Sequence, residues 1–205
     1  MRVKIKICGM TRGRDVSAAV QAGADALGFV FAPRSKRVLD SDRAAGLVAA
    51  VPAFVSRVGL FMDQDFESVA AILDHVPLNL LQFHGAEDAA FCRQFGLPYI
   101  KAVSMVAGDA VTRAVEEFGD AAALLLDSHS SGGVGGTGKV FDWSLVPECA
   151  LPLVLAGGLT PGNVRRAVEQ VRPWAVDVSS GVESAPGIKS EALMQEFIKE
   201  AKCEY

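Results

Sequence analysis

Residues 153–181 read LVLAGGLTPGNVRRAVEQVRPWAVDVSSG, and this stretch holds every part of a strand–helix–strand unit. The apolar run 153–156 is short and continuous, which is typical of a strand buried on both faces. Thr160 stands before a proline, a pair that favours a helix start, and residues 161–170 have apolar side chains at helical spacing. A second apolar run, 174–178, follows. The stretch therefore predicts two parallel strands joined by a crossover helix.

The same unit is found eight times along the chain. Each copy has a short apolar run, a glycine or polar turn, and a segment with apolar residues at helical spacing. Some of these helical segments start at good capping residues, such as Ser41 and Asp109. The expected strands are residues 3–7, 26–31, 54–61, 78–83, 99–103, 122–127, 153–156 and 174–178. The expected helices are residues 15–22, 41–50, 66–74, 87–95, 109–118, 142–146, 161–170 and 189–201.

Eight consecutive strand–helix units predict an α/β protein with one closed (β/α)8 barrel, the TIM barrel, because closure removes both sheet edges. An open doubly wound sheet of eight parallel strands is the structural alternative. The sequence has no pair of similar halves, no linker and no change in composition, which favours the barrel. We expect residues 1–205 to form a single domain, near the lower length limit for this fold.

Composition restricts the classes of function. Half of the residues are apolar and 21% are charged, which fits a globular protein with a sizeable core. The net charge of -4 argues against a general affinity for nucleic acid or anionic membranes, so any phosphate binding must be local.

The cysteines and the N-terminus indicate a compartment. The four cysteines are far apart, without a C-x-x-C pair or a metal-ligand spacing, and the N-terminus lacks an apolar signal region. No apolar run reaches the roughly 20 residues of a membrane helix. These features predict a soluble protein of the reducing cytoplasm.

In a barrel of this kind, the active site lies at the C-terminal ends of the strands. Two glycine-containing turns follow the seventh and eighth expected strands there, and their backbone N–H groups could approach an anion without an intervening Cβ. Glycines also make ordinary turns, but this pairing after the last two strands is where such barrels commonly bind phosphate. The predicted phosphate-binding residues are Gly157, Gly158, Ser180 and Gly181.

Residues 133–139, GVGGTGK, match G-x-G-x-x-G and most of a P-loop. However, Val140 occupies the position where a P-loop needs a hydroxyl for magnesium, and no long helix follows. The Rossmann alternative lacks the acidic residue at the end of the next strand. We interpret the segment as a mobile loop over the sixth strand end, able to close on a ligand.

Four other polar residues follow strands at the same end of the expected barrel. Cys8 and Asp127 are candidates for acid–base chemistry, although a lone cysteine is often a small buried residue and a lone aspartate often caps a loop. His84 is a mouth residue or a packing histidine, and three histidines without a carboxylate cluster give a metal site little support. Arg37, in a basic loop, could pair with a substrate anion.

Seven motifs, one for nearly every loop and in order, together resemble phosphoribosylanthranilate isomerases of tryptophan biosynthesis. They are KICGMT at 6–11, GFVF at 28–31 with SKR at 35–37, LQFHG at 81–85, LDS at 126–128, GGTGKVFDW at 135–143, LAGGL at 155–159 and DVSSGVE at 177–183. The resemblance covers the whole chain. Phe83 and residues 31–34 depart conservatively from the motifs of the family, and these departures leave every candidate site residue in place.

The resemblance implies an Amadori rearrangement of N-(5-phospho-β-D-ribosyl)anthranilate to 1-(2-carboxyphenylamino)-1-deoxy-D-ribulose 5-phosphate, without cofactor or metal. It implies that Cys8 is the catalytic base and Asp127 the acid, that Arg37 contacts the ligand, and that the two glycine turns bind its phosphate. His84, by its place at the mouth, and Asp177, which lies in one of the motifs, are the other expected substrate-binding residues.

Other functions on this scaffold remain open. An aminoaldose isomerase acting on an imidazole substrate would use paired aspartates, whereas the first strand offers Cys8, and a ribulose-phosphate epimerase would use metal ligands, which are scarce. A phosphometabolite sensor would need only the anion pocket. The sequence shows no obvious broad apolar patch on its helices, and we expect a monomer.

Overall fold

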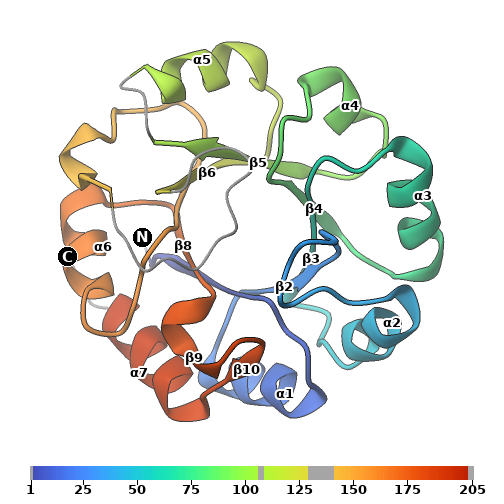
Figure 1. The fold of residues 1–205 in the computed structure, drawn as a ribbon. Coiled ribbons are helices and arrows are strands. Elements are labelled where there is room, and N and C mark those ends of the chain that lie inside the picture. Colours follow the sequence, from blue (N-terminus) through green and yellow to red (C-terminus); the bar gives the residue numbers. More distant parts are fainter. Residues whose placement is uncertain (1, 106–108, 129–140, 203–205) are drawn as a thin grey trace.

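The computed structural model describes residues 2–105, 109–128 and 141–202 and contains the predicted closed barrel. The strands pair in chain order, all parallel, and β8 pairs with β1, so the open-sheet alternative is wrong. Figure 1 looks along the barrel, with the helices arranged around the strands. The strands are β1 (Lys4–Cys8), β2 (Ala26–Val30), β3 (Ser56–Phe61), β4 (Leu80–Phe83), β5 (Tyr99–Ser104), β6 (Ala123–Asp127), β7 (Leu153–Leu155) and β8 (Ala175–Val178).

Helices with the expected amphipathic spacing cover the outside of the barrel. They are α1 (Gly13–Ala22), α2 (Ser41–Ala49), α3 (Phe66–His75), α4 (Ala89–Arg93), α5 (Ala110–Glu117), α6 (Val164–Val171) and α7 (Glu191–Ala201). Asp40, Asp65 and Asp88 cap α2, α3 and α4 by accepting a hydrogen bond from the backbone N–H three residues on. The cap of α2 is thus Asp40, one residue before the predicted Ser41, and Asp109 makes no side-chain cap bond to α5.

The helix predicted for residues 161–170 begins later than expected, at Val164. The Asn163 side chain accepts a hydrogen bond from Thr160 N–H and donates one to the carbonyl oxygen of Gly158. These two bonds hold residues 160–163 in a turn, so Pro161 lies before the helix and not at its first position. The same bonds tie the start of α6 to the glycine turn after β7.

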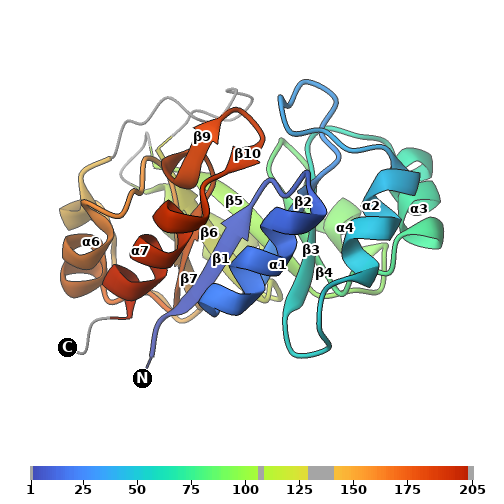
Figure 2. The same cartoon turned by 90° about the horizontal axis from the view of Figure 1, so that it is seen from below.

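Two expected helices differ more strongly. Residues 142–146 form only a short 3₁₀ turn, η1 (Trp143–Leu145), because Pro147 disfavours helical backbone at the residue before it. The helix expected from residue 189 begins at Glu191, after a hairpin of β9 (Glu183–Ala185) and β10 (Ile188–Lys189) that the sequence analysis did not foresee. Figure 2 shows this hairpin at the rim to which β1 runs, opposite the N-terminus.

Both faces of the strands are buried. Successive side chains of a strand point alternately toward the helices and into the barrel, and this alternation decides which side chains enter the barrel. On β6, Leu124 and Leu126 pack toward the helices in the large core, whereas Ala123 and Leu125 belong to a separate cluster inside the barrel. The next inward position on this strand is Asp127. Outer positions also hold large aromatic residues, such as Phe61 stacked on Phe31 with ring centroids 5.3 Å apart.

Within these described residues, no helix is long and apolar enough to cross a membrane, and no group of three or more His, Cys, Asp or Glu side chains is arranged to hold a metal ion.

Candidate functional site

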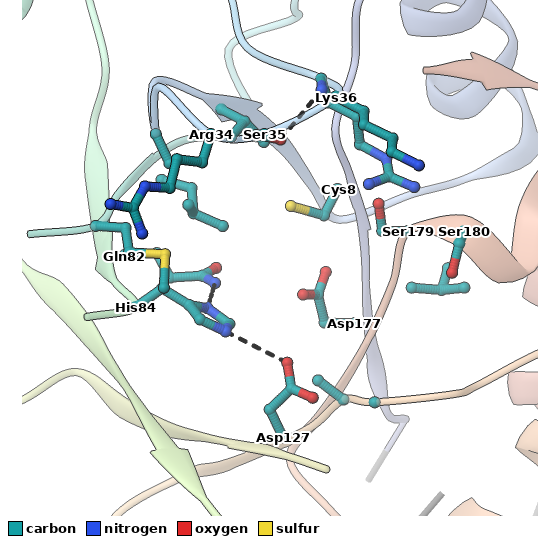
Figure 3. Close-up of a pocket in the computed structure, with 18 of the residues that line it drawn as sticks. Cys8, Arg34, Ser35, Lys36, Gln82, His84, Asp127, Asp177, Ser179 and Ser180 are labelled. Atoms are coloured by element: carbon teal, nitrogen blue, oxygen red, sulfur yellow. Dashed lines mark hydrogen bonds and ion pairs between the residues drawn. The ribbon is translucent and has the colours of Figure 1, made fainter. Parts of the chain in front are cut away.

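A cavity of about 380 Å³ opens at the C-terminal ends of the strands, where the sequence analysis expected the site. Figure 3 shows polar side chains from several strand ends facing it. All nine predicted site residues line this cavity: Cys8, Arg37, His84, Asp127, Gly157, Gly158, Asp177, Ser180 and Gly181.

Strand alternation explains why Cys8, Asp127 and Asp177 share the cavity. On β1, Ile5 and Ile7 pack outward in the large core, so Cys8 points inward, and on β8 the same alternation turns Asp177 inward between two outward valines. Since each strand is in register with its neighbours, these inward side chains meet at the same end of the barrel.

Cys8 lies deep in the cavity, and a buried ion pair lies beside it. The ammonium of Lys6 is 2.9 Å from Asp177 Oδ1, and both side chains are almost fully buried. Burial raises the pKa of the Cys8 thiol, while the positive charge of Lys6 opposes this shift. Cys8 therefore holds its proton more firmly than a free thiol, and the thiolate, when it forms, is a stronger base.

Asp127 is in contact with a histidine across the cavity. Its Oδ2 atom lies 3.4 Å from His84 Nε2, and His84 Nδ1 lies 3.0 Å from the amide nitrogen of Gln82. Figure 3 draws this chain of three side chains at the edge of the cavity. A thiol and a carboxyl group that face one cavity supply the two kinds of group that acid–base chemistry requires.

The two glycine turns bring backbone to the cavity wall at points where a side chain would not fit. Gly157 has a φ of +80°, and a Cβ there would meet Ser128 N at 2.6 Å. A Cβ on Gly181 would lie 1.9 Å from the carbonyl oxygen of Leu159. The Ser180–Val182 segment forms a 3₁₀ turn after β8, so this wall offers backbone groups to a ligand beside the side chains of Ser179 and Ser180 (Figure 3).

Arg37 already has a partner in the structure. Its guanidinium donates to both carboxylate oxygens of Glu183, at 2.7 and 2.6 Å, and these bonds raise the pKa of Arg37. The ammonium of Lys189 also donates to Glu183 Oε1, at 2.8 Å, and to the Ser179 carbonyl oxygen, at 3.0 Å. Burial favours a neutral Glu183, but the hydrogen bonds and charges of Arg37 and Lys189 outweigh it and lower the pKa of Glu183.

The sequence analysis did not select Lys6, Gln82, Glu183 or Lys189. Lys6 and Gln82 each stand two residues before a selected residue, Cys8 and His84, and strand alternation puts both pairs on one face. That signal could have found them. Nothing in the sequence pairs Arg37 with Glu183, which lies 146 residues away, or reveals the hairpin that carries Lys189. The proposed mobile loop, 133–139, lies outside the described residues.

Comparisons with known proteins show the family of this chain. Residues 5–200 match the family model of N-(5′-phosphoribosyl)anthranilate isomerase. An N-(5′-phosphoribosyl)anthranilate isomerase of Pseudomonas fluorescens is 51% identical over 197 residues, which are 96% of this chain and 97% of that protein.

Two solved structures have the same fold along nearly their whole length. A phosphoribosylanthranilate isomerase bound to reduced 1-(o-carboxyphenylamino)-1-deoxyribulose 5-phosphate superposes with a TM-score of 0.83 at 39% identity, covering 98% of both chains. Monomers made from the dimeric isomerase of Thermotoga maritima give 0.84 at 39% identity, with the same coverage. The chain therefore belongs to the N-(5′-phosphoribosyl)anthranilate isomerase family.

Proposed function

We propose that the chain converts N-(5-phospho-β-D-ribosyl)anthranilate to 1-(2-carboxyphenylamino)-1-deoxy-D-ribulose 5-phosphate in tryptophan biosynthesis. The reaction is an aldose–ketose isomerisation, an intramolecular oxidoreduction. The observation that carries the proposal is one cavity lined by Cys8, Asp127 and both glycine turns. A relative of similar structure binds a reduced form of this product, which supports the same substrate class here.

Asp127 acts first, as the general acid. Ring opening requires a proton on the furanose oxygen while the anthranilate nitrogen forms a Schiff base with C1′. A neutral Asp127 carboxyl group supplies that proton, which stays on the sugar as a hydroxyl group.

Cys8 acts second, as the general base. Its thiolate removes the C2′ proton from the Schiff base, and the electron pair of the broken C–H bond forms the C1′–C2′ double bond of an enolamine. The enolamine then gains a proton at C1′ and loses one from the C2′ hydroxyl to give the ketone. No electrons enter from another molecule, so these steps need no redox cofactor.

Recognition of the substrate is divided between backbone and side chains. We assign the phosphate to the turns at Gly157, Gly158, Ser180 and Gly181, whose N–H groups can donate to its oxygens. Arg37, His84 and Asp177 are assigned to the rest of the substrate. Since Arg37 is held in a fixed position by Glu183, its remaining N–H donors are already oriented when an anion arrives.

A substrate panel tests the function. The purified chain is incubated with the anthranilate adduct, with an aminoaldose carrying an imidazole, and with ribulose 5-phosphate, and loss of substrate is followed by fluorescence or chromatography. We expect turnover of the anthranilate adduct. If the chain turned over only one of the other two sugars, that sugar would be its substrate in place of the anthranilate adduct. Tight binding of a sugar without turnover of any of them would favour a phosphometabolite sensor.

We expect Gly181→Ala to weaken substrate binding. The new Cβ would lie 1.9 Å from Leu159 O, so the turn must move away from the position in which its N–H groups meet the phosphate. Loss of one hydrogen bond to a charged group costs about 1.5–3 kcal/mol, which corresponds to a rise in KM of roughly 10- to 100-fold. Steady-state kinetics measures this rise.

Gly46→Ala is the matched control for this variant. Gly46 lies in α2, and a Cβ there meets no atom within 4 Å. We expect it to leave KM and kcat unchanged. An unchanged KM in Gly181→Ala, or an equal rise in both variants, would contradict the phosphate assignment.

We expect alkylation of Cys8 in the free protein to be slow at neutral pH and to accelerate at alkaline pH. Only the thiolate reacts, and burial raises the pKa of Cys8 above the usual value of 9.0, so the midpoint should lie above 9.0. Mass spectrometry of the Cys8 peptide after timed exposure to iodoacetamide at a series of pH values gives this midpoint. A midpoint below that of free cysteine would contradict the environment described for Cys8.

Three further properties belong to the same proposal: residues 1–205 form a single domain, the chain is cytoplasmic, and it is a monomer. The relative from Thermotoga maritima is dimeric, and Phe54 of this chain is fully exposed in the loop before β3. Sedimentation velocity of the purified chain tests this, and we expect the mass of a monomer. If the chain is instead a dimer, Phe54→Ser tests whether the exposed Phe54 side chain holds the dimer together.

A further inference from the structure

Gln82 and His84 form a polar pair at the inward face of the end of β4. Leu81 and Phe83 pack outward in the large core, so Gln82 and His84 both turn toward the cavity. Gln82 is fully buried, and its amide nitrogen lies 3.0 Å from His84 Nδ1. The other ring nitrogen, Nε2, lies 3.4 Å from Asp127 Oδ2. The three side chains therefore form a continuous chain of polar contacts that ends on the proposed acid.

The donor at one end of this chain fixes where the proton of a neutral His84 lies. An amide nitrogen can only donate, so Nδ1 must accept and cannot carry a proton. A neutral imidazole then carries its proton on Nε2, which faces Asp127. An ionised carboxylate can only accept, so Asp127 favours the same arrangement from the other end.

Turning the Gln82 amide would reverse this arrangement. Its Oε1 atom has no hydrogen-bond partner among the described residues, so the contact with His84 is the bond that orients the amide. With Oε1 toward the ring, Nδ1 would carry the proton, and Nε2 would face Asp127 as a bare acceptor. The orientation of the amide and the tautomer of the ring are therefore coupled.

The contact with His84 also makes the two oxygens of Asp127 different. Nε2 lies 3.4 Å from Oδ2, so a proton donated by His84 would go to Oδ2, and the proton of the neutral acid would then belong on Oδ1. Oδ1 lies on the side of Gly157, where a Cβ would come within 2.8 Å of it. The Ser128 hydroxyl lies on the same side and donates to this oxygen, with Oγ 3.5 Å from Oδ1.

We propose that His84 is a positioning residue that donates its Nε2 proton to Asp127 Oδ2, with Gln82 holding this tautomer, so that the carboxyl group of Asp127 is held in one orientation at the cavity. The proposal rests on the assignment of Asp127 as the general acid. It gives His84 a role beyond contact with the substrate, and it gives Gln82 a role that the sequence analysis did not consider.

The first test measures the tautomer without substrate. ¹⁵N chemical shifts of ring-labelled histidine distinguish a protonated from a bare ring nitrogen, and the spectrum of His84→Asn assigns the signals of His84. We expect a bare Nδ1 and a protonated Nε2 at neutral pH. The opposite tautomer would overturn the proposal, whatever the chain does with the anthranilate adduct.

The second test changes the donor and measures turnover. In Gln82→Glu the new carboxylate cannot donate to Nδ1 and instead accepts from it, so a neutral ring takes the opposite tautomer and turns a bare Nε2 toward Asp127. We expect kcat to fall by up to about 100-fold, with KM changed little, and the ¹⁵N shift of Nδ1 to move to that of a protonated nitrogen. Gln94→Glu makes the same chemical change on an exposed side chain and should leave both unchanged.

A pair of variants at His84 makes the test independent of whether Gln82→Glu folds. The amide nitrogen of His84→Gln can reach the position of Nε2 and donate to Asp127, whereas the shorter His84→Asn cannot. We expect His84→Gln to keep most of the kcat that His84→Asn loses. Equal kcat in the two variants would overturn the proposal. Full turnover by Asp127→Asn would instead refute the assignment of the acid and leave the measured tautomer standing.

Discussion

Replacing Cys8 by alanine is expected to lower kcat by roughly 10²- to 10⁴-fold, the usual contribution of a positioned acid–base group. The inward position at the end of β1 brings the thiol into the cavity, and Asp177, which also lines it, is held in an ion pair with Lys6. Without the thiolate, the C2′ proton has no base of comparable strength at that position. KM should change little, because we assign the phosphate to the glycine turns after β7 and β8.

Steady-state kinetics of Cys8→Ala beside Cys149→Ala measures this effect. Cys149 is a free cysteine that does not line the cavity, so its removal controls for the loss of a thiol as such. Cys8→Ser adds a second comparison, since a hydroxyl of nearly the same size is a far weaker acid. Wild-type kcat in Cys8→Ala would eliminate Cys8 as the base.

Asp127→Asn is expected to lower kcat by a similar factor, roughly 10²- to 10⁴-fold. The amide has the same shape as the carboxyl group and its oxygen can still accept from His84, so the local packing should survive. It cannot supply an acidic proton to the furanose oxygen, so ring opening becomes slow.

Binding of a reduced, unreactive product analogue separates this effect from damage to the cavity. We expect the dissociation constant of Asp127→Asn to stay close to that of the unchanged chain while turnover is lost. Asp42→Asn, at an exposed carboxylate paired with His75 on the outer helices, is the control and should retain full kcat. If Asp127→Asn loses binding and turnover together, Asp127 holds the substrate instead of protonating it.

The barrel could be predicted because its signal repeats. Eight apolar runs separated by segments with helical spacing allow few arrangements, and the pairing of β8 with β1 confirms the closed one. The site was predictable for the same reason, since polar residues at strand ends must meet at one end of a closed barrel. Their roles rest on the resemblance and remain proposals.

Details that depend on distant partners could not be predicted. The ion pair of Arg37 with Glu183 joins the loop after β2 to the segment after β8, and no periodic pattern connects the two. The hairpin β9–β10 is too short for a strand signal. The helix expected at 142–146 was wrong because the effect of Pro147 on the preceding backbone outweighed the apolar spacing of five residues.

The C2′ proton of the substrate gives the most direct test of the account. The anthranilate adduct is prepared with deuterium at C2′ and incubated with the unchanged chain or with Cys8→Ala, and NMR follows both the label and the sugar. We predict that the unchanged chain removes the deuterium from C2′ as the ketose forms, more slowly than it removes hydrogen, while Cys8→Ala leaves both label and sugar essentially unchanged. Equal loss of the label from C2′ with both proteins would contradict the account, because the proton would then leave C2′ without Cys8.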